Sequence, residues 1–134
     1  MQIICIDYSE IYYPEIAKTP VPDRRAGKFV QVRHNNTEYL IFSPKEFTPY
    51  HADLVKLFCK EKGLKGSFNR TSKYFEISDP AWVVTGGGKF EVDKKKKFIR
   101  LYDNSMAYGQ FDRRGLKEKI LSMGFASDYM VVIE

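Results

Sequence analysis

The alternation of hydrophobic and polar residues predicts several strands in the first third of the chain. Residues 1–6 hold a short run of isoleucines and read as a strand. Residues 28–33 alternate between apolar and polar side chains, and the apolar segment 38–42 follows a turn at residues 35–36. These two segments predict a hairpin. Residues 7–27 contain three prolines, and we expect a loop there.

Apolar residues at helical spacing predict two helices. The first follows Thr48, which can cap it, and Pro49, which suits the first helical position. Its apolar stripe is formed by Leu54, Val55, Leu57 and Phe58. Gly63 is a natural end for this helix. The second helix is predicted from a cap at Asp112 to an end at Gly124.

Five further apolar segments predict strands. They are residues 74–77, 81–84, 89–92, 98–102 and 129–133. The order of strands, helix, strands, helix and strand predicts an α+β fold, with one mixed β-sheet of about six strands packed by two main helices. A length of 134 residues fits a single domain. We therefore expect one domain over residues 1–134, in which residues 1–27 form an N-terminal extension that the pattern defines least.

Composition narrows the classes of protein that fit. The chain has 22 Lys and Arg against 17 Asp and Glu, a net charge of +5, which suggests an anionic ligand or partner. Two cysteines are too few for a disulfide scaffold. Neither His34 nor His51 forms a close-spaced pair with a cysteine, so we expect no metal site and no cofactor. The chain shows no signal peptide and no apolar run of about 20 residues, so we expect a cytoplasmic protein.

His51 is the residue best suited to catalysis. It lies in the helix-start segment 48–53, where N–H groups without intrahelical partners can bind an anion. The positive end of the helix dipole disfavours a proton on a nearby imidazole. A neutral imidazole can act as a general base or a nucleophile. A surface or capping histidine would give the same sequence pattern.

Two small-residue segments could approach a ligand closely. Ser105-Met-Ala-Tyr-Gly109 follows a predicted strand, so its backbone N–H groups and the Ser105 hydroxyl could bind a phosphate. A plain strand-to-helix turn is the alternative. Gly86-Gly87-Gly88 permits a tight turn or a bulge, and no Lys-Ser/Thr follows it as a P-loop requires. We expect a structural role for these three glycines.

The basic residues fall into three groups. Lys28 opens a predicted strand after a glycine and could bind a phosphate. The run from Lys94 to Lys97 is typical of a solvated hairpin tip. Basic and aromatic residues interleave from Lys65 to Phe75, which is compatible with nucleic-acid binding.

Taken together, these segments resemble the Janus/Ocnus family. The matching strings are Lys28-Phe-Val-Gln-Val-Arg33, Tyr50-His-Ala-Asp53, Gly86-Gly-Gly-Lys-Phe90 and Ser105-Met-Ala-Tyr-Gly109, in the family's order. The resemblance covers roughly residues 28–134. It implies the activity of a protein phosphohistidine phosphatase. Such an enzyme hydrolyses the P–N bond of phosphohistidine, and of some phospholysine, in proteins, and its reaction needs no metal ion.

The resemblance also implies roles for individual residues. His51 would be the catalytic base or nucleophile, and Lys28 would bind the phosphate. Lys89 stands where the family's vertebrate enzyme has an arginine. The phosphate pocket would be formed around Tyr50, Ala52, Ser105, Met106 and Ala107. The implied partner is a phosphohistidine-containing protein substrate, with no nucleic acid and no membrane, and we expect a monomer.

The chain departs from the family pattern in two further places. Residues 63–85 form a longer segment than expected, and a basic residue before the catalytic helix is replaced by Ser43 or its neighbour, for which Lys45 could compensate. Two alternative functions remain at this stage. One is a non-catalytic phosphoprotein-binding module of the same family, and the other is a basic nucleic-acid-binding domain.

Overall fold

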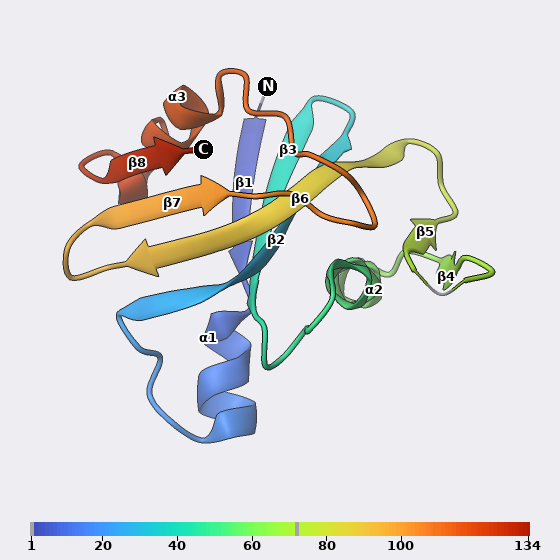
Figure 1. Ribbon diagram of the computed structural model, residues 1–134, viewed down its shortest axis with the longest axis horizontal. Coiled ribbons are helices and arrows are strands. Elements are labelled where there is room, and N and C mark those ends of the chain that lie inside the picture. The colour runs from blue at the N-terminus through green and yellow to red at the C-terminus, as the bar shows by residue number, and fades with distance from the viewer. Residues whose placement is uncertain (1, 72) are drawn as a thin grey trace.

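Six strands form one mixed sheet in the computed structural model, which describes residues 2–71 and 73–134. The strands are β1 (Gln2–Asp7), β2 (Arg24–His34), β3 (Thr37–Pro44), β6 (Trp82–Asp93), β7 (Phe98–Tyr102) and β8 (Met130–Ile133). Their spatial order is β1-β3-β2-β6-β7-β8 (Figure 1). Only the β1–β3 and β7–β8 pairs within this sheet are parallel. The predicted α+β fold is confirmed.

Three helices alternate with the strands along the described part of the chain. They are α1 (Ser9–Ile11), which continues as the π-helical segment Tyr12–Ala17, then α2 (His51–Lys62) and α3 (Leu116–Leu121), with a 3₁₀ turn at Gly124–Ala126. The short strands β4 (Gly66–Phe68) and β5 (Phe75–Ile77) form a separate antiparallel hairpin. In Figure 1 this hairpin lies beside α2, at one end of the long strand β6. The predicted helices correspond to α2 and α3.

The sheet separates two hydrophobic clusters. Side chains alternate across a strand, so the neighbours Phe29 and Val30 of β2 enter different clusters. Val30 packs in the cluster that contains Leu54 and Phe58 of α2. Phe29 packs in the cluster that contains Leu116 of α3. The two helices therefore cover opposite faces of the sheet.

The prediction of a loop over residues 7–27 is wrong at both of its ends. Residues 9–17 are helical, and β2 begins at Arg24. Tyr8 is buried in the hydrophobic cluster that contains Leu54 and Phe58 of α2, which we call the α2 cluster, and Ile11 packs against it. This tertiary packing stabilises helical turns where the prolines favoured a loop. The N-terminal segment also completes the sheet, because β1 pairs with β3 along its whole length.

The predicted end of the first helix at Gly63 is confirmed, but both predicted N-terminal caps are wrong. The helix α2 begins after Tyr50, whose N–H donates to the Asp53 carboxylate at 3.2 Å, whereas the Thr48 N–H closes a turn onto the Pro44 oxygen at 3.1 Å. The helix α3 begins after Gly115 and ends at Leu121, before the predicted Gly124. The Asp112 carboxylate instead accepts the N–H of Arg114 at 3.1 Å, before the helix, and a 2.9 Å charge-assisted hydrogen bond from the Arg33 guanidinium.

The two predicted strands around the triple glycine are one strand. β6 runs unbroken from Trp82 to Asp93 and pairs with β2 along its length. The pairing register shifts between Gln31 and Val32, opposite the start of the glycine run. Of the two structures that three glycines permit, the bulge is therefore present and the tight turn is not.

Candidate functional site

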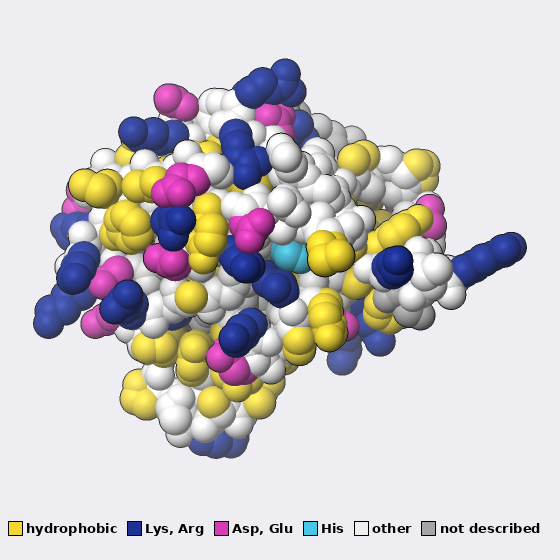
Figure 2. All heavy atoms as spheres, in the orientation of Figure 1, with side chains coloured by type: hydrophobic (Ala, Val, Ile, Leu, Met, Phe, Trp, Pro, Cys, Tyr) yellow, Lys and Arg dark blue, Asp and Glu magenta, His cyan; other side chains and the backbone are white. Residues whose placement is uncertain are grey.

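A cleft of about 790 Å³ lies where α2 begins, on the sheet face that α2 covers. Its walls come from β2, β6, the segment after β7 and the β4–β5 hairpin. Seven of the eight site residues predicted from the sequence line it, namely Lys28, Tyr50, His51, Ala52, Lys89, Met106 and Ala107. On the face shown in Figure 2, histidine surface (cyan) borders both basic and hydrophobic side chains. The cleft therefore combines an imidazole, cations and apolar groups.

His51 is the first residue of α2 and is 8% exposed. Its Nε2 lies 2.9 Å from the backbone oxygen of Gly88. A carbonyl oxygen only accepts, so Nε2 carries the hydrogen and donates it. In the neutral ring the lone pair is then on Nδ1. The imidazole is held in one tautomer that leaves Nδ1 as its basic and nucleophilic atom.

The surroundings of His51 favour the neutral ring. Burial is the largest cause that lowers the pKa of His51, and the nearby Lys28 and Lys89 charges lower it further. The hydrogen bond to Gly88 and the carboxylate of Asp103 act in the opposite direction and are outweighed. His51 is therefore unprotonated at neutral pH.

Close contacts with other groups require glycine at positions 86 and 87. A methyl group on Gly87 would stand 2.9 Å from His51 Cδ2 and 2.6 Å from the Phe29 backbone oxygen. A methyl group on Gly86 would stand 2.2 Å from the Gln110 oxygen. Contacts below 3.0 Å force atoms to move, so only glycine lets the His51 ring and the segment after β7 pack onto β6.

Lys28 and Lys89 are direct cross-strand partners in β2 and β6, so both side chains leave the same face of the sheet. Like charges opposite each other are unfavourable unless an anion lies between them. Lys89 forms an ion pair with Asp103 at 3.2 Å, and Lys28 has no ion pair within the described residues. The prediction that Lys28 opens a strand is wrong, because β2 extends back to Arg24 along β6.

The segment 105–109 is a closed loop. The N–H of Ser105 donates to the Gly109 oxygen at 3.1 Å, and the N–H of Gly109 donates back at 2.7 Å. Ser105 is buried, and its hydroxyl accepts the N–H of Tyr108 at 3.1 Å. Ser105 is the one predicted site residue that does not line the cleft. Its side chain shapes the loop that brings Met106 and Ala107 to the cleft.

Two elements that line the cleft carry backbone N–H groups without an acceptor in the described part of the chain. The N–H groups of His51 and Ala52 begin α2 and have no acceptor within residues 2–71 and 73–134. The same holds there for the N–H groups of Met106 and Ala107. Unsatisfied N–H groups together with two lysines form a site for a multiply charged anion such as a phosphoryl group.

Six residues that line the cleft were not predicted as site residues, and two of them, Pro49 and Asp53, belong to the predicted helix start. Asp103 and Asn104 follow β7, and Phe68 and Lys73 belong to the β4–β5 hairpin and its turn. The basic and aromatic residues of this hairpin were the signal, which suggested a nucleic-acid surface. Two of them, Phe68 and Lys73, line the same cleft as His51.

Tyr108 connects the hairpin to the loop. Its hydroxyl donates to the Phe75 oxygen at 2.7 Å and accepts the Phe75 N–H at 2.8 Å. Tyr108→Phe removes both bonds and leaves polar groups of a buried residue unpaired. We expect it to lower the free energy of unfolding by about 1–3 kcal/mol, measured by urea denaturation. Tyr74→Phe is the matched control, because the Tyr74 hydroxyl makes no hydrogen bond to the residues that the structure describes, and its ring also packs against Tyr108. An equal effect of both variants would contradict this account.

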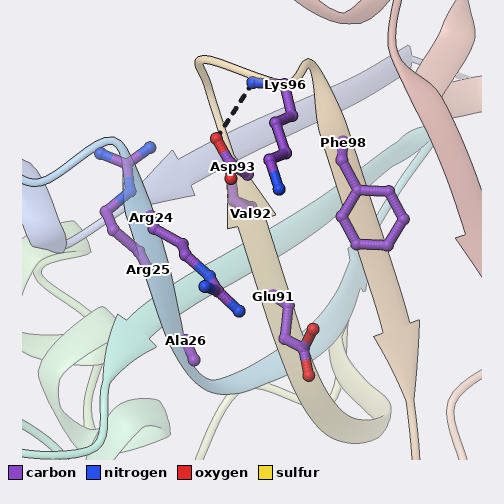
Figure 3. A pocket seen from close by; sticks show the side chains of 8 residues that line it. All are labelled: Arg24, Arg25, Ala26, Glu91, Val92, Asp93, Lys96 and Phe98. Carbon is purple, nitrogen blue, oxygen red and sulfur yellow. Dashed lines mark hydrogen bonds between the residues drawn. The ribbon is translucent and has the colours of Figure 1, made fainter.

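A second cavity of about 460 Å³ lies over β2, β6 and β7. Figure 3 shows Arg24 extending toward Glu91 on the neighbouring strand, and Asp93 accepting the N–H of Lys96. Its lining contains no histidine, cysteine or serine. This cavity therefore combines acidic and basic side chains but lacks these nucleophilic residues in its described lining. The His51 cleft is the candidate site.

The cysteines are unsuited to nucleophilic chemistry. Burial raises the pKa of the Cys5 thiol to about 12 and that of Cys59 to about 11, so both stay protonated at neutral pH. Within the described residues, no three or more His, Cys, Asp or Glu side chains gather as metal ligands would. None of the described helices has the length and apolar character needed to span a membrane.

Comparison with known proteins identifies one relationship. The model of the Janus/Ocnus family matches residues 26–129, which include every residue of the cleft discussed above. A comparison with curated proteins finds no match.

Proposed function

Because this chain belongs to the Janus/Ocnus family, we propose that it is a metal-independent protein phosphohistidine phosphatase. The observation that carries the proposal is the neutral His51, with Nδ1 unprotonated, beside the cross-strand pair Lys28 and Lys89. A phosphoryl group needs cations and N–H donors, and its hydrolysis needs a base or a nucleophile. The cleft offers both in one place.

The phosphoryl oxygens would bind Lys28, Lys89 and the N–H groups of Ala52 and Ala107. The P–N bond of phosphohistidine is labile, so positioning and charge stabilisation supply most of what the reaction requires. Water attacks phosphorus, the P–N bond breaks, and its electron pair goes to the substrate imidazole, which takes up a proton.

His51 fits two routes for this step. As a general base, Nδ1 accepts a proton from the attacking water. As a nucleophile, Nδ1 attacks phosphorus, and water then hydrolyses the phosphorylated His51. Both routes need the same tautomer, in which Nε2 donates to Gly88.

The second candidate function is a non-catalytic phosphoprotein-binding module, because the lysines and N–H groups of the cleft would bind a phosphoryl group without any turnover. Turnover separates the two functions. With phosphohistidine peptide in large excess, a phosphatase releases more phosphate than there are protein molecules. A binding module releases none above the spontaneous rate and protects the peptide that it binds.

The lowered pKa of His51 gives a pH dependence. Protonation of Nδ1 removes the base, so activity requires a pH above the pKa of His51, which lies below the ordinary 6.5. We expect kcat/KM to be level at neutral pH and to fall on the acid side through a pKa below 6.5. Kinetics corrected for spontaneous hydrolysis, with an NMR titration of the His51 ring, measure this. An acid limb at or above 6.5 would argue against a neutral His51.

A further inference from the structure

Exposed apolar side chains surround the entrance of the His51 cleft. Tyr50 is 72% exposed, Phe68 38% and Met106 103%, and all three line the cleft. They come from three separate elements, namely the residue before α2, the strand β4 and the loop 105–109. We call these three residues the apolar rim. Exposed apolar groups that gather around a site indicate binding of an apolar partner.

Two parts of the apolar rim, Phe68 and the loop that carries Met106, are connected before any ligand arrives. The Phe68 ring packs edge-on against Phe75 with ring centres 5.3 Å apart, and Lys56 Nζ lies 5.4 Å from the Phe68 ring centre. Phe75 is in turn hydrogen-bonded to Tyr108 of the loop that carries Met106. The hairpin and the loop therefore form one connected wall, which reduces the entropic cost of binding.

The basic residues of the cleft and the apolar rim suit different parts of a ligand. Lys28 and Lys89 suit a phosphoryl group, whereas the apolar rim offers that group nothing. A volume of about 790 Å³ is also larger than one phosphorylated side chain needs. Free phosphate or a free amino acid would leave the rim exposed to water.

We propose, on the basis of the function proposed above, that the apolar rim selects phosphohistidine that is carried on a polypeptide next to large apolar residues. The phosphoryl group binds beside Lys28, Lys89 and His51, and the flanking side chains cover Tyr50, Phe68 and Met106. The substrate class is thus an apolar peptide segment around phosphohistidine, and the β4–β5 hairpin determines specificity through Phe68.

Two peptides and a free amino acid test this. They are Gly-Leu-phosphohistidine-Leu-Gly, Gly-Gly-phosphohistidine-Gly-Gly and phosphohistidine itself. We expect the wild type to favour the leucine peptide in kcat/KM by about tenfold, since covering half-exposed apolar side chains supplies that much affinity. Phe68→Ala and Met106→Ala should each reduce this preference about threefold, and Phe68→Ala should change hydrolysis of free phosphohistidine by less than about twofold.

Phe125→Ala is the matched control, because Phe125 is 58% exposed and does not line the cleft. It should leave the preference unchanged. A wild type without preference, or a preference that survives both rim substitutions, overturns the inference. Binding of the same two peptides with a stable phosphoryl-triazole in place of phosphohistidine, measured by calorimetry, provides a second readout. A leucine preference in binding without any turnover would refute the phosphatase and support the rim.

Discussion

His51→Ala is expected to lower kcat for phosphohistidine hydrolysis by about 10³-fold, the size of effect typical for loss of a general base or nucleophile. The variant keeps Lys28 and the backbone donors, so peptide binding should persist. His51→Gln should be equally inactive, since an amide can still donate to the Gly88 oxygen but has no basic nitrogen. Steady-state kinetics on both variants, with circular dichroism as a check of folding, measure this effect.

The second histidine of the chain supplies the control. His34 stacks on Trp82 with ring centres 3.8 Å apart and does not line the cleft. His34→Ala should therefore leave kcat close to that of the wild type. Activity retained in both His51 variants would show that His51 is not catalytic.

Gly87→Ala is the other substitution with a large expected effect. The added methyl group meets the Phe29 backbone oxygen at 2.6 Å and the His51 ring at 2.9 Å, so strand and ring must separate. We expect the free energy of unfolding to fall by about 1–3 kcal/mol, as for other overpacked sites. We also expect kcat to fall about 100-fold, because the imidazole is displaced from the phosphoryl site.

Gly124→Ala tests whether this effect is specific to the contact. A methyl group at Gly124 would meet no atom within 4 Å, and its φ is not in the left-handed region. Its stability and kcat should match the wild type. If Gly87→Ala behaved like Gly124→Ala, the packing of His51 on the glycine run would have no functional importance.

The β2–β3 hairpin and the helix α2 were predicted correctly from short stretches of sequence. The alternation in residues 28–33 and the turn at residues 35–36 correspond to the β2–β3 hairpin. The apolar stripe that includes Leu54 and Phe58 corresponds to the buried face of α2. The helix α2 has one buried and one exposed face, so its period is visible in the sequence. The strands β2 and β3 are largely buried on both faces, so the hairpin was visible from its apolar segments and from the turn between them.

The errors arose where distant contacts decide the structure. The glycine run remains a strand because β2 pairs with it and the His51 ring lies on it, and neither contact is visible in a sequence window. Helical turns form over residues 9–17 because the segment packs on the α2 cluster. The strand β4 is three residues long, too short for a period to show, whereas its partner β5 lies within the strand predicted over residues 74–77.

Most of the candidate site was predicted from short strings of sequence, but two of its features were not. Ser105 was expected at the phosphate and instead shapes the loop by accepting the Tyr108 N–H. Phe68 and Lys73 enter the cleft only because the hairpin folds back and bonds to Tyr108 through Phe75. That arrangement depends on a contact between residues 33 positions apart.

Phosphate release from a histidine-phosphorylated peptide tests the central claim most directly. The protein is used in catalytic amounts with EDTA in excess, and wild type, His51→Ala and His34→Ala are compared by phosphorus NMR. We predict many equivalents of phosphate from the wild type and from His34→Ala, and only the spontaneous rate from His51→Ala. Release that requires an added metal ion, or that His51→Ala sustains at the wild-type rate, would contradict the account.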